Sequence, residues 1–304
     1  MTNKKKILIT IVIPTYNNDF LLQKSINSVV KQTFDNFELL IIDNHSTDKT
    51  SEIISEFNDS RISHIKIRNN GIISKSRNLG IKLAQGEWIA FLDSDDIWYS
   101  KRLEKISKFC TKQYNFDVIT TNEYKVFDKS TKRQKLFYGL KSSNKYKSLL
   151  LYGNRLSPSA TVVRKTFLKK HYLFFKENKE FTTVEDYDFW LMLAFNNAKF
   201  LYLKSFEGEY LMHPNNYSNK VDLHNKNLLS LLKHHVYKVQ KFDKNKDSLF
   251  AKIITFRKFS FLVKEKDFWR SLSIFIRSPF YIIRILSVKM LLKVINELKS
   301  FFIK

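Results

Sequence analysis

Three carboxylates lie within four residues of this sequence, at Asp93, Asp95 and Asp96. They follow residues 88–92, a short apolar run whose aromatic and β-branched side chains predict a buried strand. Acidic groups packed at a strand end repel one another and raise one another's pKa unless a cation lies among them. Mg²⁺ and Mn²⁺ prefer carboxylate oxygens and also bind phosphates, so the cluster predicts a site for a divalent metal and a diphosphate. The alternative is a solvated acidic turn that caps the next helix.

Strand and helix patterns alternate through residues 1–125 and would position this cluster. Such alternation is typical of a mainly parallel sheet with helices on both faces, so we expect an α/β fold. Ligands bind such sheets outside the carboxyl ends of the strands, where we expect Tyr16, Asp43 and Asp93 to share one crevice. The predicted strands are 7–13, 37–42, 62–67, 88–92 and 118–121, and the predicted helices are 19–31, 46–57, 72–84 and 101–112.

The rest of the chain follows a less regular pattern. Short strands are predicted at 135–138, 160–163 and 200–203, and helices at 146–152 and 185–196. From residue 221 onward the pattern indicates helices in which apolar and basic residues are mixed.

The composition excludes several classes of protein. With 304 residues, 43% of them hydrophobic, the chain can bury a core and is not disordered by composition. The single cysteine, Cys110, excludes a disulfide framework and a cysteine zinc cage. Residues 7–13 are too short and too β-branched for the core of a signal peptide and run into Pro14, so we interpret them as the first strand.

The net charge of +24 is concentrated toward the end of the chain, because residues 226–304 hold 18 Lys and Arg against 5 Asp and Glu. This excess favours an anionic partner, either nucleic acid or a lipid surface. In residues 268–303, basic residues interrupt the apolar ones too often for a span of about 20 apolar residues. We therefore expect amphipathic helices on an anionic membrane surface, or else helices that pack on the rest of the chain.

Five motifs stand in a recognisable order. They are Ile-Pro-Thr-Tyr-Asn at 13–17, Ile-Asp-Asn-His-Ser-Thr-Asp at 42–48, Ser-Arg-Asn-Leu-Gly at 76–80, Phe-Leu-Asp-Ser-Asp-Asp at 91–96 and Val-Glu-Asp-Tyr-Asp-Phe-Trp at 184–190. Together they resemble the motifs of family 2 glycosyltransferases, across residues 7–215. The resemblance implies a GT-A type fold in a catalytic domain at 1–220, with the nucleotide sugar bound by 1–125 and the acceptor side formed by 126–220. Residues 221–304 would then form a basic helical C-terminal region.

The resemblance also implies how the donor is bound. Asp95 would be the direct metal ligand, and His213 would approach the metal or pyrophosphate; a hydrogen-bonded loop histidine is the alternative. The chain departs from the family's common Asp-Asp-Gly-Ser pattern at Asn44 and His45, and Asn44 can donate as well as accept at a base. Tyr16 could instead be a core tyrosine and Arg77 a surface arginine. Asp96 would cap the helix that starts near Ser100 or order the loop. The residues expected to contact the donor are Pro14, Tyr16, Asp43, Asn44, Arg77 and Asp93.

Asp186 matches the position of the family's catalytic base, at the start of the predicted helix 185–196. There it would remove the proton from the acceptor hydroxyl as that oxygen attacks the anomeric carbon, which inverts the configuration in a single displacement. Glu185 would orient the acceptor or the loop, and Asp188 is disfavoured because it lies on another face of the helix. Capping of the helix start is the alternative role for these carboxylates.

The resemblance, together with the acidic cluster, therefore implies an inverting transferase dependent on Mn²⁺ or Mg²⁺. It would move a hexosyl or N-acetylhexosaminyl group from a UDP-sugar to a glycan or lipid-linked glycan, as in surface polysaccharide or lipooligosaccharide synthesis. We expect it in the cytoplasm at the inner face of the membrane. A nucleotidyltransferase is the enzymatic alternative, although no Gly-rich phosphate loop follows the first strand. The alternative that is not an enzyme is a basic nucleic-acid-binding protein. No zinc-finger, RNA-recognition or helix-turn-helix signature supports it, and we expect no nucleic acid partner.

Overall fold

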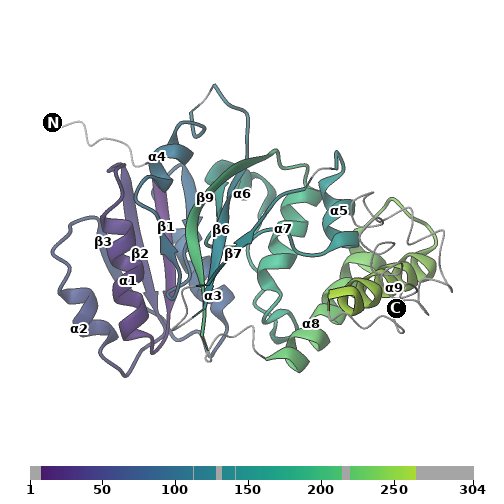
Figure 1. The fold of residues 1–304 in the computed structure, drawn as a ribbon, viewed down its shortest axis with the longest axis horizontal. Coiled ribbons are helices and arrows are strands. Elements are labelled where there is room, and N and C mark those ends of the chain that lie inside the picture. Colours follow the sequence, from purple (N-terminus) through teal and green to yellow (C-terminus); the bar gives the residue numbers. More distant parts are fainter. Residues whose placement is uncertain (1–7, 112, 128–131, 141, 214–219, 265–304) are drawn as a thin grey trace, which may run out of the picture. The chain divides into compact units, whose positions relative to one another are not determined.

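Four parallel strands form the first part of the sheet (Figure 1). In the computed structural model, which describes residues 8–111, 113–127, 132–140, 142–213 and 220–264, their order is β3-β2-β1-β4. The expected βα alternation is confirmed, since all neighbouring pairs among these four strands are parallel. The strands are β1 (Ile9–Thr15), β2 (Phe37–Asp43), β3 (Ile62–Lys66) and β4 (Trp88–Phe91).

The helices that connect these strands bury apolar residues at helical spacing. Leu22, Ile26 and Val29 of the first helix are fully buried, because a period of three to four residues places them on one face. The third helix packs close to β1 at Gly80, where any Cβ would collide with the side chain of Val12. The helices are α1 (Asp19–Val30), α2 (Thr50–Ser55), α3 (Ile73–Leu83) and α4 (Arg102–Ser107).

The second part of the sheet mixes strand directions. Strand β4 pairs with an antiparallel strand, β8, which pairs with β6, and β6 runs parallel to β9 with two register shifts. Two short strands extend this part, since β7 pairs with β6 and β5 pairs with β9. These strands are β5 (Ile97–Trp98), β6 (Val118–Phe127), β7 (Arg133–Leu136), β8 (Thr161–Arg164) and β9 (Phe200–Met212).

Several predicted boundaries were wrong. The strands expected at 118–121 and 200–203 are the much longer β6 and β9, and the helix expected at 101–112 ends at Ser107. Strand β9 continues through polar residues and Gly208 because β6 and β5 pair with it on its two sides. Such pairing comes from distant parts of the chain, so the local hydrophobic pattern does not report it.

The remaining helices complete two compact units of the described chain. The first unit ends at Leu231, and the second consists of residues 150–152 together with the chain from Leu232 onward. No described helix is both long and apolar enough to cross a bilayer. The expected membrane-surface helices at 268–303 lie outside the described residues. The helices are α5 (Lys145–Tyr152), α6 (Lys165–His171), α7 (Glu185–Phe195), α8 (Val221–His234) and α9 (Lys246–Lys264), with a 3-10 turn at Lys179–Phe181 and a π-helical turn at His235–Val239.

Candidate active site

The carboxyl ends of β1, β2 and β4 lie side by side, as predicted. Thr15 and Asp43 are paired at the ends of β1 and β2, and Asp93 follows β4. Tyr16 is 58% exposed, so it is not a core tyrosine and its ring can stack on a ligand. Pro14, by contrast, is buried within β1.

Asp43 orders the loop that follows β2. Its side chain is fully buried; Oδ1 accepts hydrogen bonds from the backbone N and Oγ of Ser46 at 2.9 and 2.6 Å, and Oδ2 lies 3.2 Å from Nε2 of His64. Asn44 accepts a hydrogen bond from the backbone N of Asn69 at 2.8 Å. His45 has a φ of 54°, a left-handed conformation that favours glycine, which is why glycine suits this position in the common pattern.

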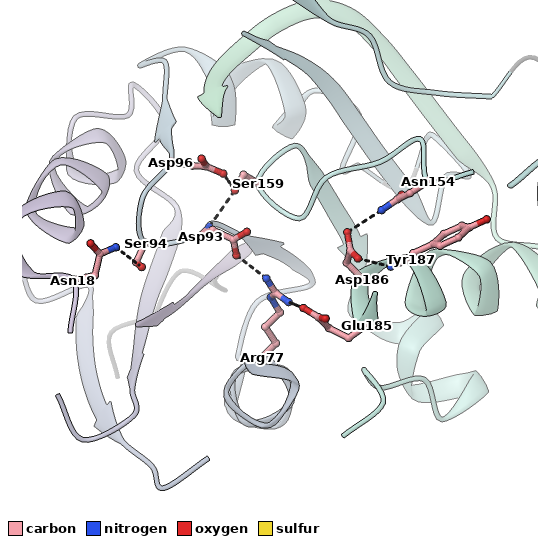
Figure 2. Close-up of polar contacts among 10 residues, drawn as sticks. All are labelled: Asn18, Arg77, Asp93, Ser94, Asp96, Asn154, Ser159, Glu185, Asp186 and Tyr187. Atoms are coloured by element: carbon pink, nitrogen blue, oxygen red, sulfur yellow. Dashed lines mark hydrogen bonds and ion pairs between the residues drawn. The ribbon is translucent and has the colours of Figure 1, made fainter. Parts of the chain in front are cut away.

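Arg77 joins the acidic loop after β4 to the start of α7 (Figure 2). It donates hydrogen bonds to Oδ1 of Asp93 at 2.7 Å and to Oε1 of Glu185 at 2.8 Å. Its side chain is only 3% exposed, so the alternative of a surface arginine is wrong. Burial lowers the pKa of Arg77, but the charges of Asp93 and Glu185 outweigh burial and raise it. Arg77 is therefore a permanent cation that neutralises two carboxylates of the site.

Asp95 meets His213 across the loop, with 2.9 Å between Oδ2 and Nε2. Burial and then the charge of Asp93 raise the pKa of Asp95, although the hydrogen bond with His213 lowers it. In the described part of the chain, no group of three or more His, Cys, Asp or Glu is arranged to hold a metal. One carboxylate and one imidazole nevertheless suit a divalent ion that takes its other ligands from water and a diphosphate.

Asp96 fixes the acidic loop and does not cap the following helix, so of the two roles considered for it the ordering of the loop is the correct one. Its buried carboxylate accepts hydrogen bonds from Oγ of Ser159 at 2.5 Å and from the backbone N of Leu211 at 3.1 Å. Oγ of Ser159 in turn accepts a hydrogen bond from the backbone N of Asp93 at 3.1 Å. Because Leu211 precedes His213 by two residues, Asp96 also holds the end of β9 beside the loop.

Asp186, the second residue of α7, carries a carboxylate suited to proton transfer. It accepts hydrogen bonds from Nδ2 of Asn154 and from the backbone N of Tyr187, at 2.9 and 2.6 Å. Burial and then the charge of Glu185 raise the pKa of Asp186 to about 7, against the lowering effect of Arg77. A base is most effective when its pKa lies near the working pH, so this carboxylate can accept a proton from a hydroxyl.

The other carboxylates of α7 have different surroundings. Glu185 is buried, and its Oε2 has no hydrogen-bond partner among the described residues. Asp188, the residue considered less suited to act as the base, is also buried and lies 3.3 Å from Nζ of Lys176.

The segment before α7 is held in a strained conformation. Thr183 has a φ of 74°, which is unusual for a β-branched residue. Asn227 of α8 donates a hydrogen bond to the carbonyl of Thr182 at 2.6 Å, and Nδ1 of His224 lies 3.2 Å from the carbonyl of Thr183. Sequence reasoning missed Asn154, Ser159 and Asn227, because each of them lies in an irregular segment or far along the chain from its partner.

Comparison with known sequences gives a consistent result. The family model for glycosyl transferase family 2 matches residues 10–172, just over half of the chain. The chain is 37% identical over 137 residues to UDP-Glc:alpha-D-GlcNAc-diphosphoundecaprenol beta-1,3-glucosyltransferase WfgD of Escherichia coli, which covers 43% of this chain and 53% of that protein. It is 32% identical over 227 residues to an uncharacterized glycosyltransferase of Methanocaldococcus jannaschii, covering 71% of this chain and 75% of the relative. The chain thus spans about half the length of WfgD and three quarters of the second relative.

Solved structures share the fold. S. aureus TarS 1-349 in complex with UDP-GlcNAc has a TM-score of 0.65 at 24% identity and covers 84% of this chain and 73% of that one. Mannosyltransferase PcManGT from Pyrobaculum calidifontis, in complex with GDP-Man and Mn²⁺, has a TM-score of 0.59 at 11% identity and covers 98% of this chain and 81% of that one. These likenesses confirm the predicted α/β fold of GT-A type.

Proposed function

We propose, because this chain belongs to glycosyl transferase family 2, that it transfers a sugar from a UDP-sugar to a hydroxyl of a glycan or lipid-linked glycan with inversion of configuration. The observation that carries this proposal is the ion-pair bridge from Asp93 through Arg77 to Glu185, next to Asp186. The bridge connects the loop that carries Asp95 with Glu185, the residue that precedes the proposed base. Arg77 would thereby fix the position of the donor-binding loop relative to the start of α7, where the acceptor would bind.

In this scheme Asp186 takes the proton from the acceptor hydroxyl as its oxygen attacks the anomeric carbon. The bond from that carbon to the diphosphate oxygen breaks in the same step, so no covalent sugar–enzyme intermediate forms. Asn154 keeps the carboxylate of Asp186 oriented through its hydrogen bond. Glu185 would orient the acceptor or the loop, while Arg77 stays bound to protein carboxylates.

Asp95 and His213 would hold a Mn²⁺ or Mg²⁺ ion in this scheme. Such an ion would neutralise the diphosphate as it leaves. Asp96 and Ser159 keep Asp95 and the end of β9 together before any ligand arrives. Tyr16 would border the nucleotide base, and the loop ordered by Asp43 would carry Asn44 toward it.

The relatives support this choice of donor and acceptor. The name of WfgD specifies UDP-Glc and a diphosphoundecaprenol-linked acceptor, and TarS was crystallised with UDP-GlcNAc. A lipid-linked acceptor would place the enzyme at the inner face of the membrane, where the basic residues of 268–303 would meet anionic lipids. Residues 1–220 would then form the catalytic domain and 221–304 a membrane-associated region.

The test is incubation of the full chain with UDP-Glc or UDP-GlcNAc, Mn²⁺ and a GlcNAc-diphosphate-lipid. Release of UDP together with a glycosylated lipid of inverted configuration at the anomeric carbon is the expected result. Release of pyrophosphate would instead identify a nucleotidyltransferase. A product that retains the configuration would exclude the single displacement.

A further inference from the structure

One face of the β6–β7–β9 sheet carries aromatic side chains that are partly open to solvent. Residues paired across neighbouring strands point to the same side of a sheet. Tyr124 pairs with Lys135 on β7 and with Glu209 on β9, and Phe206 pairs with Asn122, two residues before Tyr124. Phe137 comes two residues after Lys135 and so belongs to the same side. We call this surface the aromatic face; its rings are Tyr99, Tyr124, Phe137 and Phe206.

The four rings contact one another in a row. The ring centroids of Tyr124 and Phe206 lie 4.6 Å apart, Phe137 meets Phe206 edge-on at 5.3 Å, and Tyr99 lies 6.5 Å from Tyr124. Phe137 is 66% exposed even though it is part of this row. Contiguous exposed aromatic residues mark binding surfaces more often than single ones do. Their mutual packing also means that little side-chain entropy would be lost on binding.

Charged groups flank the rings on the same face. Nζ of Lys135 lies 5.6 Å from the centroid of the Phe206 ring, and Nη2 of Arg133 lies 3.0 Å from Oε1 of Glu209. Glu209 also accepts a hydrogen bond from the hydroxyl of Tyr99 at 2.9 Å. The side chain of Arg133 is 57% exposed, so the ion pair leaves it accessible to a ligand. The aromatic face therefore combines apolar rings with hydrogen-bond donors of net positive charge.

We propose that the aromatic face binds an acidic glycan, as the part of the acceptor that lies beyond the reacting sugar. Sugar rings present C–H groups that pack against aromatic faces, and carboxylate or phosphate substituents would bind Lys135 and Arg133. Strand β9 leads from this face toward the site, and the four residue-to-residue steps from Glu209 to His213 span about 13 Å when extended. A chain of a few sugars can cover that length. This inference rests on the proposed function and names the class of acceptor.

The experiment measures binding of hexagalacturonate to the full chain by isothermal titration calorimetry. In the variant with Phe137→Ala and Lys135→Ala, loss of the stacking and charge contacts should weaken binding about tenfold. The matched control replaces Lys82 and Phe174 by alanine. These residues form a similar exposed pair, with Nζ 5.8 Å from the ring centroid, away from the aromatic face. The control should bind like the wild type, and both variants should keep the wild-type melting temperature.

Three further probes define the outcomes, namely maltohexaose, phosphatidylglycerol vesicles and an oligouridylate. Weaker binding of maltohexaose than of hexagalacturonate would support the role of the charges. The proposal is overturned if the wild type does not bind hexagalacturonate or if the double variant binds it equally well. Binding to vesicles or oligouridylate in place of hexagalacturonate would also overturn it. UDP release from UDP-sugar is measured in parallel, so that a failure of the proposed function is distinguished from a failure of glycan binding.

Discussion

The polar side chains at the carboxyl ends of β1, β2 and β4 are bonded to other protein groups, whereas the aromatic face leaves Phe137 and Lys135 exposed. Asp43, Asp93 and Asp96 each have protein partners within hydrogen-bond distance. Phe137 and Lys135 are both exposed, and each contacts the ring of Phe206. If the proposed function is correct, the difference means that the region that would bind the donor is organised beforehand, as catalysis requires. The open face instead suits a variable, extended ligand.

Arg77 joins the loop after β4 to the start of α7, and its removal should have the largest effect. In Arg77→Ala, Glu185 loses its cation while remaining buried, and Asp93 loses its cation in a partly exposed loop. Breaking a buried ion pair in this way should lower the free energy of unfolding by about 3–5 kcal/mol, as measured by urea denaturation.

The control is Lys108→Ala, which removes an exposed helical ion pair at 3.6 Å and should cost less than about 1 kcal/mol. If Arg77→Ala is as stable as Lys108→Ala, the bridge does not join the two sides.

Asp186→Asn should reduce turnover without changing donor binding. The substitution keeps the size of the side chain but removes the base, so turnover should fall about 10²-fold or more. Binding of UDP, followed by calorimetry, should remain at the wild-type level because the donor loop is unchanged. Asp188→Asn serves as the comparison for turnover, since Asp188 lies near Lys176. Turnover near normal in Asp186→Asn would remove this residue from the mechanism.

The contrast between the carboxyl ends of the strands and the aromatic face also explains what could be predicted from the sequence. Tyr16, Asp43 and Asp93 could be placed on one edge because parallel strands of alternating βα units end together. The resemblance assigned Asp95 and His213 to one metal site, and the structure brings the two side chains within 2.9 Å, which also agrees with the alternative of a hydrogen-bonded loop histidine. The cation that neutralises Asp93 could not be predicted, because no basic residue stands beside the acidic cluster in the sequence. Arg77 lies on α3, which packs close to β1 at Gly80, and from there it reaches Asp93.

The aromatic face was beyond prediction for a related reason. Tyr99, Tyr124, Phe137 and Phe206 come from four segments that no local pattern connects. Their common orientation depends on the register of β6, β7 and β9, and a shift of one residue would turn each side chain to the other face. The length of β9 itself was underestimated for the same reason. Contacts that depend on long-range register therefore mark the limit of the sequence argument.

Asp95→Asn should weaken metal-dependent UDP binding, with a smaller effect than the two substitutions above. An amide is a weaker ligand than a carboxylate for Mn²⁺, so the Mn²⁺ concentration needed for half-maximal UDP binding should rise about tenfold or more. Thermal shift with UDP and a Mn²⁺ titration measures this, with chelator as the metal-free reference. Asp35→Asn is the control, because the side chain of Asp35 is 88% exposed. If Asp95→Asn gives the wild-type titration, the metal is held elsewhere.

The pH dependence of turnover should give the smallest and most specific effect. Only the carboxylate form of Asp186 can accept a proton, and its pKa of about 7 means that turnover should rise with pH through neutrality. At saturating donor, turnover should be about half-maximal at pH 7 and about a tenth of maximal at pH 6.

Glu185→Gln removes the negative charge that helps to raise the pKa of Asp186. The rise of turnover with pH, which we call the limb of the profile, should therefore move to lower pH. The exposed Glu180, replaced by Gln, should leave the limb in place because its charge is solvated. The profile is read as the initial rate of UDP release between pH 5.5 and 8.5. An unmoved limb in Glu185→Gln would mean that burial alone sets the pKa of Asp186. A shift would show that Glu185, which Arg77 binds, also raises the pKa of Asp186. The ion-pair bridge of Arg77 would then affect the reaction as well as the stability of the protein.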